Sequence, residues 1–267
     1  MTRRLRQYRT VFAAALTLLV TVGCHSPTKE VAESPPAGWP ASLNDFTITW
    51  TGEPGIDLTA DAAVVVRAYM ESYYLAYLTT DRKYLYPGFQ QSVAANEPDG
   101  PAGSQERWPV PNRERTWVGT ARHHLLRIDR SDRDVTVVGC VYSYGTAEYT
   151  DYGFQANVGG TGPNSGISAF RVEMRAPASA VNLPPQQGDS RAPFVNVFDG
   201  WQVSNYQGGF LLLAHWDSSA DEVLCASRAD RTPESRTFTP GNSYPRSDFP
   251  TLPAAPGWPA ESATATN

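Results

Sequence analysis

The chain has 267 residues, of which 41% are hydrophobic, and a net charge of −5. That length and composition suit one globular domain with a sizeable core. Residues 1–23 contain four arginines and no acid, so the rest of the chain has a net charge of −9. This acidic balance argues against nucleic acid as a partner and against electrostatic docking on anionic lipid.

Residues 1–24 follow the order of a secretory signal. MTRRLRQYRT is basic, VFAAALTLLVTV is a short apolar run, and a small residue, Gly23, precedes Cys24. The apolar run is shorter than the roughly 20 residues of a transmembrane helix. Thr21-Val22-Gly23-Cys24 resembles the signal of bacterial lipoproteins, although Thr21 stands where leucine is usual. An ordinary cleaved signal and an uncleaved anchor helix are the alternatives.

The lipoprotein resemblance implies that residues 1–23 are removed and that Cys24 is diacylated. Two acyl chains anchor a protein stably, whereas one gives only marginal membrane binding. Membrane lipid is then a partner through Cys24, and the protein lies extracytoplasmically, at the outer face of the cytoplasmic membrane. Lys29 and Lys83 are the only lysines beside abundant arginine, alanine, glycine and proline, a composition typical of a GC-rich genome such as that of an actinobacterium.

Two flanking segments are poor in aliphatic residues. Residues 24–45 are predicted to be a flexible tether and residues 230–267 a proline-rich disordered tail, because neither offers enough apolar surface to offset the entropy of ordering. Residues 37–41 (AGWPA) and 256–260 (PGWPA) resemble each other. Chance composition explains such an echo, or both tryptophans dock on a surface. The folded domain is expected over residues 46–229.

The first half of this domain contains the clearest helix signal. Residues 46–50 alternate as in a short strand, and apolar residues then recur at helical spacing over 60–79, with Thr59 as a possible cap. A second short helical stretch follows from Asp81 and is interrupted by Pro87-Gly88. Residues 94–113, rich in proline, glycine and asparagine, are predicted to be a loop.

The second half has the alternation of β-strands. Residues 115–128 and 134–144 flank a polar turn and predict a hairpin. Residues 168–174 predict a strand with one solvent-exposed face. Asp199-Gly200 between 194–198 and 201–206 predicts a second hairpin, because both turn positions favour positive φ. The spacing of Ser219 and Glu222 predicts a short helix over 220–229. The fold class is therefore α+β: a long N-terminal helix packed on a curved antiparallel sheet, a short C-terminal helix and disordered flanks.

This order of elements, ending in Gly200-Trp201-Gln202-Val203, resembles the nuclear-transport-factor-two-like superfamily. The resemblance covers residues 46–206 and implies a cone in which the helix crosses the concave face of the sheet and encloses a pocket. An unrelated antiparallel sheet packed on one helix, or a sandwich, is the alternative.

The chain has three cysteines, which limits the disulfides that it can form. If Cys24 is lipidated, Cys140 and Cys225 remain, and in an oxidising exterior they are expected to form a disulfide; two unpaired buried thiols are the alternative. There is no C-x-x-C spacing. No metal and no cofactor is expected.

Few residues are candidates for ligand binding or catalysis. Tyr69, Tyr73 and Tyr77 stand four apart and either pack in the core or line a pocket as ligand-binding residues. His123 and His124 are weak catalytic candidates that point to opposite faces of their strand, and a base of this kind needs an orienting carboxylate such as Asp151.

The leading functional hypothesis is a membrane-anchored envelope lipoprotein with a non-catalytic domain. Its domain binds a small apolar ligand or an envelope protein. The alternatives are a pocketed α+β enzyme that uses a histidine–carboxylate acid/base pair, and a structural protein whose proline-rich tail is the working part. A histidine–carboxylate pair inside a deep pocket would favour the enzyme.

Overall fold

A computed structural model describes residues 37–96, 106–179, 183–232, 235 and 238–261. The signal sequence, Cys24 and most of the expected tether lie outside the described residues. The helices are α1 (Asp61–Thr79), α2 (Phe89–Ser92) and α3 (Ser219–Ser227), with single 3-10 turns η1 (Ala41–Leu43), η2 (Arg82–Tyr84) and η4 (Arg246–Asp248). The strands are β1 (Phe46–Gly52), β2 (Trp117–Ser131), β3 (Asp134–Tyr142), β4 (Thr146–Thr150), β5 (Gly153–Ala156), β6 (Ile167–Arg175) and β7 (Gln202–Gly208).

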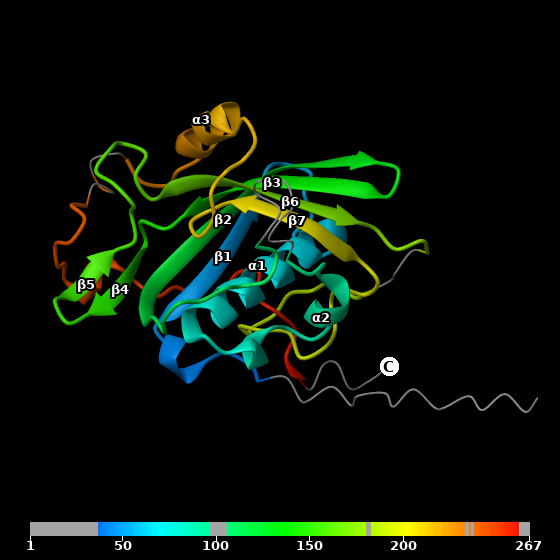
Figure 1. Cartoon of the computed structure of the whole chain (residues 1–267), viewed down its shortest axis with the longest axis horizontal. Helices are drawn as coiled ribbons and strands as arrows, with labels where there is room; N and C mark the ends of the chain where they lie inside the picture. The colour runs from blue at the N-terminus through cyan, green and yellow to red at the C-terminus, as the bar shows by residue number, and fades with distance from the viewer. Residues whose placement is uncertain (1–36, 97–105, 180–182, 233–234, 236–237, 262–267) are drawn as a thin grey trace, which may run out of the picture. The chain divides into compact units, whose positions relative to one another are not determined.

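The strands form one curled half-barrel sheet with helices on both faces (Figure 1). Its order is β5-β4-β2-β3-β6-β7, and each neighbouring pair in that path is antiparallel. β1 pairs with β2 in parallel, from Phe46 opposite Gly119 to Gly52 opposite Leu125. The chain between these two strands contains α1 and α2, and a connection of that length lets two strands run in the same direction. The α+β class is therefore present, but the sheet is not purely antiparallel.

Most of the expected elements are present. The helix expected over 60–79 is α1, the first α-helix of the described residues, and the β2–β3 hairpin turns at Asp132, whose φ is +54°. Thr59 does not cap α1: its hydroxyl donates to Asp57, and Ala60 holds the cap position. The strand over 168–174 is β6, and the helix over 220–229 is α3. The short strands β4 and β5 were not expected.

The second expected hairpin is wrong. Asp199 and Gly200 both have positive φ, and the N–H of Trp201 donates to the carbonyl of Phe198, so the turn itself forms. Residues 194–198 nevertheless do not pair with β7. The free edge of β7 is taken near Val203 by the segment after α2, since Val93 bridges to Val203 and the N–H of Ala94 donates to its carbonyl.

α1 is buried on nearly every side rather than along one stripe. Arg67, Glu71 and Ser72 are among the few polar residues in its middle, and all three are buried. A helix that is apolar around its circumference must be covered all round. The sheet covers one side of α1, and irregular segments, including the C-terminal segment, cover the others. α3 packs on β3 and β6 across the sheet from α1 (Figure 1), so the sheet is buried on both faces.

The described parts of the two flanks, residues 37–45 and 238–261, are ordered instead of disordered, and residues 24–36 and 262–267 lie outside the described residues. Trp258 is 1% exposed, Phe249 is fully buried and Phe238 is buried. The backbone of this segment pairs with the domain as well, because the N–H of Trp50 donates to the carbonyl of Ala255 at 2.7 Å. The C-terminal segment has no apolar period, and single buried aromatic side chains hold it on the domain. The domain thus extends beyond the expected limits of 46 and 229.

The two similar Trp-Pro segments are both docked. Trp39 stacks on Phe46 at 6.1 Å between ring centroids, and the Arg191 guanidinium lies 4.3 Å from the Trp39 ring. Trp258 has the Arg67 guanidinium at the same distance of 4.3 Å. Each tryptophan therefore gains a cation–π contact on the folded domain.

Candidate functional site

The tyrosine stripe of α1 belongs to the core. Tyr69 and Tyr73 are buried against each other and against Phe89 and Tyr206, and the Tyr69 hydroxyl donates to the carbonyl of Arg107 at 2.8 Å. Tyr77 stacks on Tyr73 at the half-buried end of the stripe. These side chains fill the space between helix and sheet, so of the two alternatives the structure contains core packing, and none of the three lines the groove described below.

His123 sits in an aromatic box. It is 1% exposed and stacks on Trp50 at 4.3 Å, with Tyr74 and Phe170 edge-on. Burial lowers the pKa of His123 to about 3, and a backbone interaction with Ala121 offsets this only in part. The ring is therefore neutral near pH 7.

The expected pairing of His123 with Asp151 does not occur. Asp151 is exposed on the turn between β4 and β5, and the described residues give His123 no carboxylate partner. A buried imidazole without an orienting acid is a poor general base.

His124 points to the other face, as its place on the strand predicts. Its Nδ1 lies 2.8 Å from the hydroxyl of Thr51, and its Nε2 lies 3.4 Å from a carboxylate oxygen of Glu53. The Arg228 guanidinium bonds the same Glu53 oxygen at 2.5 Å and lowers the pKa of that carboxyl. Sequence reasoning missed Glu53 because it stands in a turn after β1 with no periodic signal. A histidine–carboxylate pair exists, but it does not line the groove described below.

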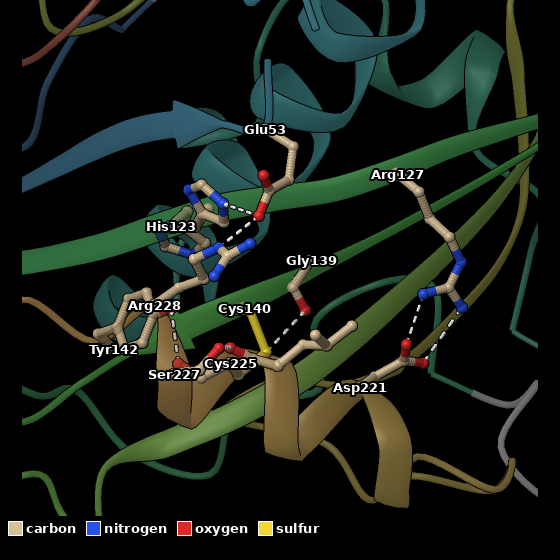
Figure 2. The surroundings of a disulfide bond; sticks show 12 residues. Glu53, His123, Arg127, Gly139, Cys140, Tyr142, Asp221, Cys225, Ser227 and Arg228 are labelled. Atoms are coloured by element: carbon tan, nitrogen blue, oxygen red, sulfur yellow. Dashed lines mark hydrogen bonds and ion pairs between the residues drawn. A yellow bond between two sulfur atoms is a disulfide. The ribbon is translucent and has the colours of Figure 1, made fainter. Parts of the chain in front are cut away.

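Figure 2 shows how α3 is fastened to the sheet beside Glu53. Cys140 of β3 and Cys225 of α3 form the expected disulfide, with Cα atoms 5.4 Å apart. Arg127 binds the carboxylate of Asp221 at 2.5 and 3.2 Å, and the Tyr142 hydroxyl donates to the carbonyl of Cys225. The disulfide and these polar contacts hold the helix in place, and nothing in them requires a ligand.

A buried charged cluster lies on α1. One oxygen of Glu71 accepts from Trp50 Nε1 at 2.8 Å, and the other accepts from Trp258 Nε1 at 2.6 Å and from the Tyr86 hydroxyl at 3.0 Å. Burial raises the pKa of Glu71, while Arg67 one turn earlier opposes that shift. The cluster ties β1 and the C-terminal segment to the helix.

Arg67 connects this cluster to a groove at the start of α1. Its guanidinium donates to the carbonyls of Leu58, Gln186 and Gly257 at 2.7, 3.0 and 2.5 Å. The N–H of Gln186 donates in turn to the carbonyl of Thr59 at 2.7 Å. Buried charge-assisted bonds of this kind fix the loops that form the groove.

The groove has a cavity volume of about 470 Å³, which lies within the roughly 300–1,000 Å³ of ordinary ligand pockets. It forms where the first turns of α1, the end of β2, the segment after β6 and the turn before β7 meet. Its apolar lining residues include Val64, Val65, Pro177, Leu183, Val197 and Trp201. We call this cavity the α1 groove.

Charged residues stand among the groove residues. Arg130 pairs with Asp61, and its guanidinium lies 5.7 Å from the Trp201 ring. Asp199 also lines the groove and has no ion-pair partner among the described residues. Asp61 and Asp199 both have positive φ, +55° and +39°, conformations that cost energy for residues other than glycine and cluster at functional sites.

Gln186 is the most buried polar residue of the groove. Gln186 is among the lining residues and is 2% exposed. Its Nε2 donates to the carbonyl of Pro184 at 2.8 Å, but its Oε1 has no hydrogen-bond partner among the described residues. A buried acceptor without a donor costs roughly 1–3 kcal/mol.

Metal-ligating clusters and membrane-spanning helices are both absent from the described part of the chain. No cluster of three or more His, Cys, Asp and Glu residues there could hold a metal ion. None of the helices in those ranges combines the length and the apolar character needed to cross a bilayer. Comparison with protein-family models, with curated proteins and with solved structures finds no match.

Proposed function

We propose that this protein is an envelope lipoprotein, held at the outer face of the cytoplasmic membrane by acyl chains on Cys24, whose folded domain binds a small molecule in the α1 groove. The observation that carries the binding function is the groove itself, a cavity of about 470 Å³ in which apolar side chains stand beside polar and charged ones. That composition is the usual one for small-molecule sites.

Two features support the extracytoplasmic location in this proposal. The signal-like order of residues 1–24 ends in Gly23-Cys24. The Cys140–Cys225 disulfide fits an oxidising compartment, since such bonds are rare in the cytosol.

The relation to the nuclear-transport-factor-two-like superfamily is part of this proposal. A helix against a curled sheet, closed by a strand that follows Gly200-Trp201, supports the relation. The parallel β1–β2 pair, the disulfide-linked α3 and the docked C-terminal segment are additions to that pattern. The cavity also lies at the start of α1 instead of under its middle.

Binding is favoured over catalysis by where the titratable groups lie. The His124–Glu53 pair is outside the groove, and His123 is neutral in an aromatic box. The groove residues include two aspartates and an arginine but no histidine or cysteine.

A groove-filling substitution tests the proposal. Ala176 is a half-buried lining residue whose hydrogen bonds to Arg133 use only its backbone, so Ala176→Trp places an indole in the cavity without removing a bond. Ala178 is exposed and outside the lining, and Ala178→Trp is the matched control. Fragment binding followed by NMR should be lost in Ala176→Trp and kept in Ala178→Trp. Equal binding by both variants would refute the groove as the site.

A further inference from the structure

We infer that the α1 groove takes an apolar molecule that carries a protonated amine. This inference rests on the proposed binding function and names the class of ligand. It comes from polar groups of the groove residues that have no hydrogen-bond or ion-pair partner among the described residues.

Two groove residues carry acceptor groups that have no partner among the described residues. Gln186 Oε1 is buried with no hydrogen-bond donor, and the Asp199 carboxylate has no cationic partner among the described residues. An ammonium group has three donors and no acceptor. It therefore suits both groups, whereas a carboxylate or phosphate suits neither.

The balance of charge around the cavity also favours a cation. Asp61 and Asp199 supply two negative charges and Arg130 supplies one positive charge. The uncapped N-terminus of α1 adds only about half a positive charge, so the sum over these groups stays negative. Because Arg130 pairs with Asp61, Asp199 is the groove acid that has no ion-pair partner among the described residues.

The protein's own Arg130 already shows that the rim accommodates a cation. Its guanidinium is paired with Asp61 and lies 5.7 Å from the Trp201 ring. A carboxylate beside an indole is a favourable environment for an organic cation, through charge and through the π face. The walls formed by Val64, Leu183 and Val197 then receive the apolar body.

The test uses three probes that differ only in the head group: 3-phenylpropylamine, 3-phenylpropan-1-ol and 3-phenylpropanoate. The full-length chain is held in lipid nanodiscs, and titration heats are corrected with protein-free nanodiscs. We expect the amine to bind about tenfold more tightly than the carboxylate, with the alcohol between them. A carboxylate that binds as tightly as the amine would overturn the inference.

Asp199→Asn removes the charge but suits the left-handed backbone, because asparagine tolerates positive φ. It should weaken amine binding about threefold to tenfold and leave the alcohol unchanged. Asp151→Asn, on the exposed β4–β5 turn, is the control and should change neither. An unchanged amine-to-carboxylate ratio in Asp199→Asn would also overturn the inference.

Ala176→Trp separates this failure from failure of the binding function. If it abolishes binding of all three probes, the groove is the site, and only the preference for an amine is at issue. If no probe binds, or if binding survives Ala176→Trp, the proposed function and the ligand class both fall.

Discussion

His123 should make the domain sensitive to acid. The imidazole is enclosed by Trp50, Tyr74 and Phe170, and burial lowers its pKa to about 3. Tyr74 is the one titratable neighbour in this box, and burial raises its pKa, so it stays neutral across the acid range. In the unfolded chain the histidine titrates near pH 6.5.

The direction in which stability changes with pH follows from the lowered pKa of His123. Below about pH 6.5 the unfolded chain binds a proton that the folded chain does not, so the free energy of unfolding falls as pH falls. The loss continues until pH reaches the folded pKa near 3. At pH 4.5, about two units below the unfolded value, it amounts to about 2.7 kcal/mol relative to pH 7.5. This figure is insensitive to the folded pKa as long as that value lies well below 4.5.

His123→Phe removes the titrating group. The larger ring will alter packing, but that cost is the same at both pH values and cancels from the pH difference. Urea unfolding at pH 7.5 and pH 4.5 should show that the native chain loses about 2.7 kcal/mol more than the variant. His123→Leu gives the same comparison with a smaller side chain. If the native chain and both variants lose stability equally, His123 is not held neutral by burial.

Three further perturbations test other parts of the account. Cys24→Ala should move the protein from the membrane fraction to the soluble or unprocessed pool, and unchanged partition with no lipid mass on the N-terminal peptide would exclude acylation. Replacing Cys140 and Cys225 by alanine opens a loop with a sequence separation of 85 and should lower the free energy of unfolding by roughly 4–5 kcal/mol; a loss under about 1 kcal/mol would contradict the loop-entropy reasoning. Glu71→Gln replaces one carboxylate oxygen by an amide NH2, so buried donors among Trp50, Trp258 and Tyr86 lose an acceptor, and urea unfolding should show a loss of about 1–3 kcal/mol. Glu222→Gln, exposed on α3, should cost less than about 0.5 kcal/mol.

Elements with a long local pattern could be predicted from the sequence. α1 contains a long run of apolar residues, and the β2–β3 hairpin and β6 alternate as strands do, so the positions of these elements follow from the sequence. The disulfide was predictable because only one pairing remains once Cys24 is set aside.

Short elements and long-range docking could not be predicted this way. β4 and β5 have five and four residues, too few to show a period. Residues 194–198 alternate like a strand, but the edge that would have received them is occupied near Val203. The C-terminal segment is held by single aromatic residues such as Trp258, whose burial depends on Glu71 far away in the sequence.

The groove was missed for the same reason. Its residues come from four separate segments, and none of those segments contains a motif. One signal was available: Arg67 and Glu71, one turn apart in an otherwise apolar helix, indicate that α1 has a second buried surface. That surface contacts Gln186 and Gly257, beside the groove.

Native mass spectrometry of the full chain, purified from its own envelope, tests the central claim most directly. The account predicts a co-purifying small molecule on the native protein and on Ala178→Trp, and its loss from Ala176→Trp. The same adduct on all three proteins, or none on the native protein together with no fragment binding at the α1 groove, would contradict the account.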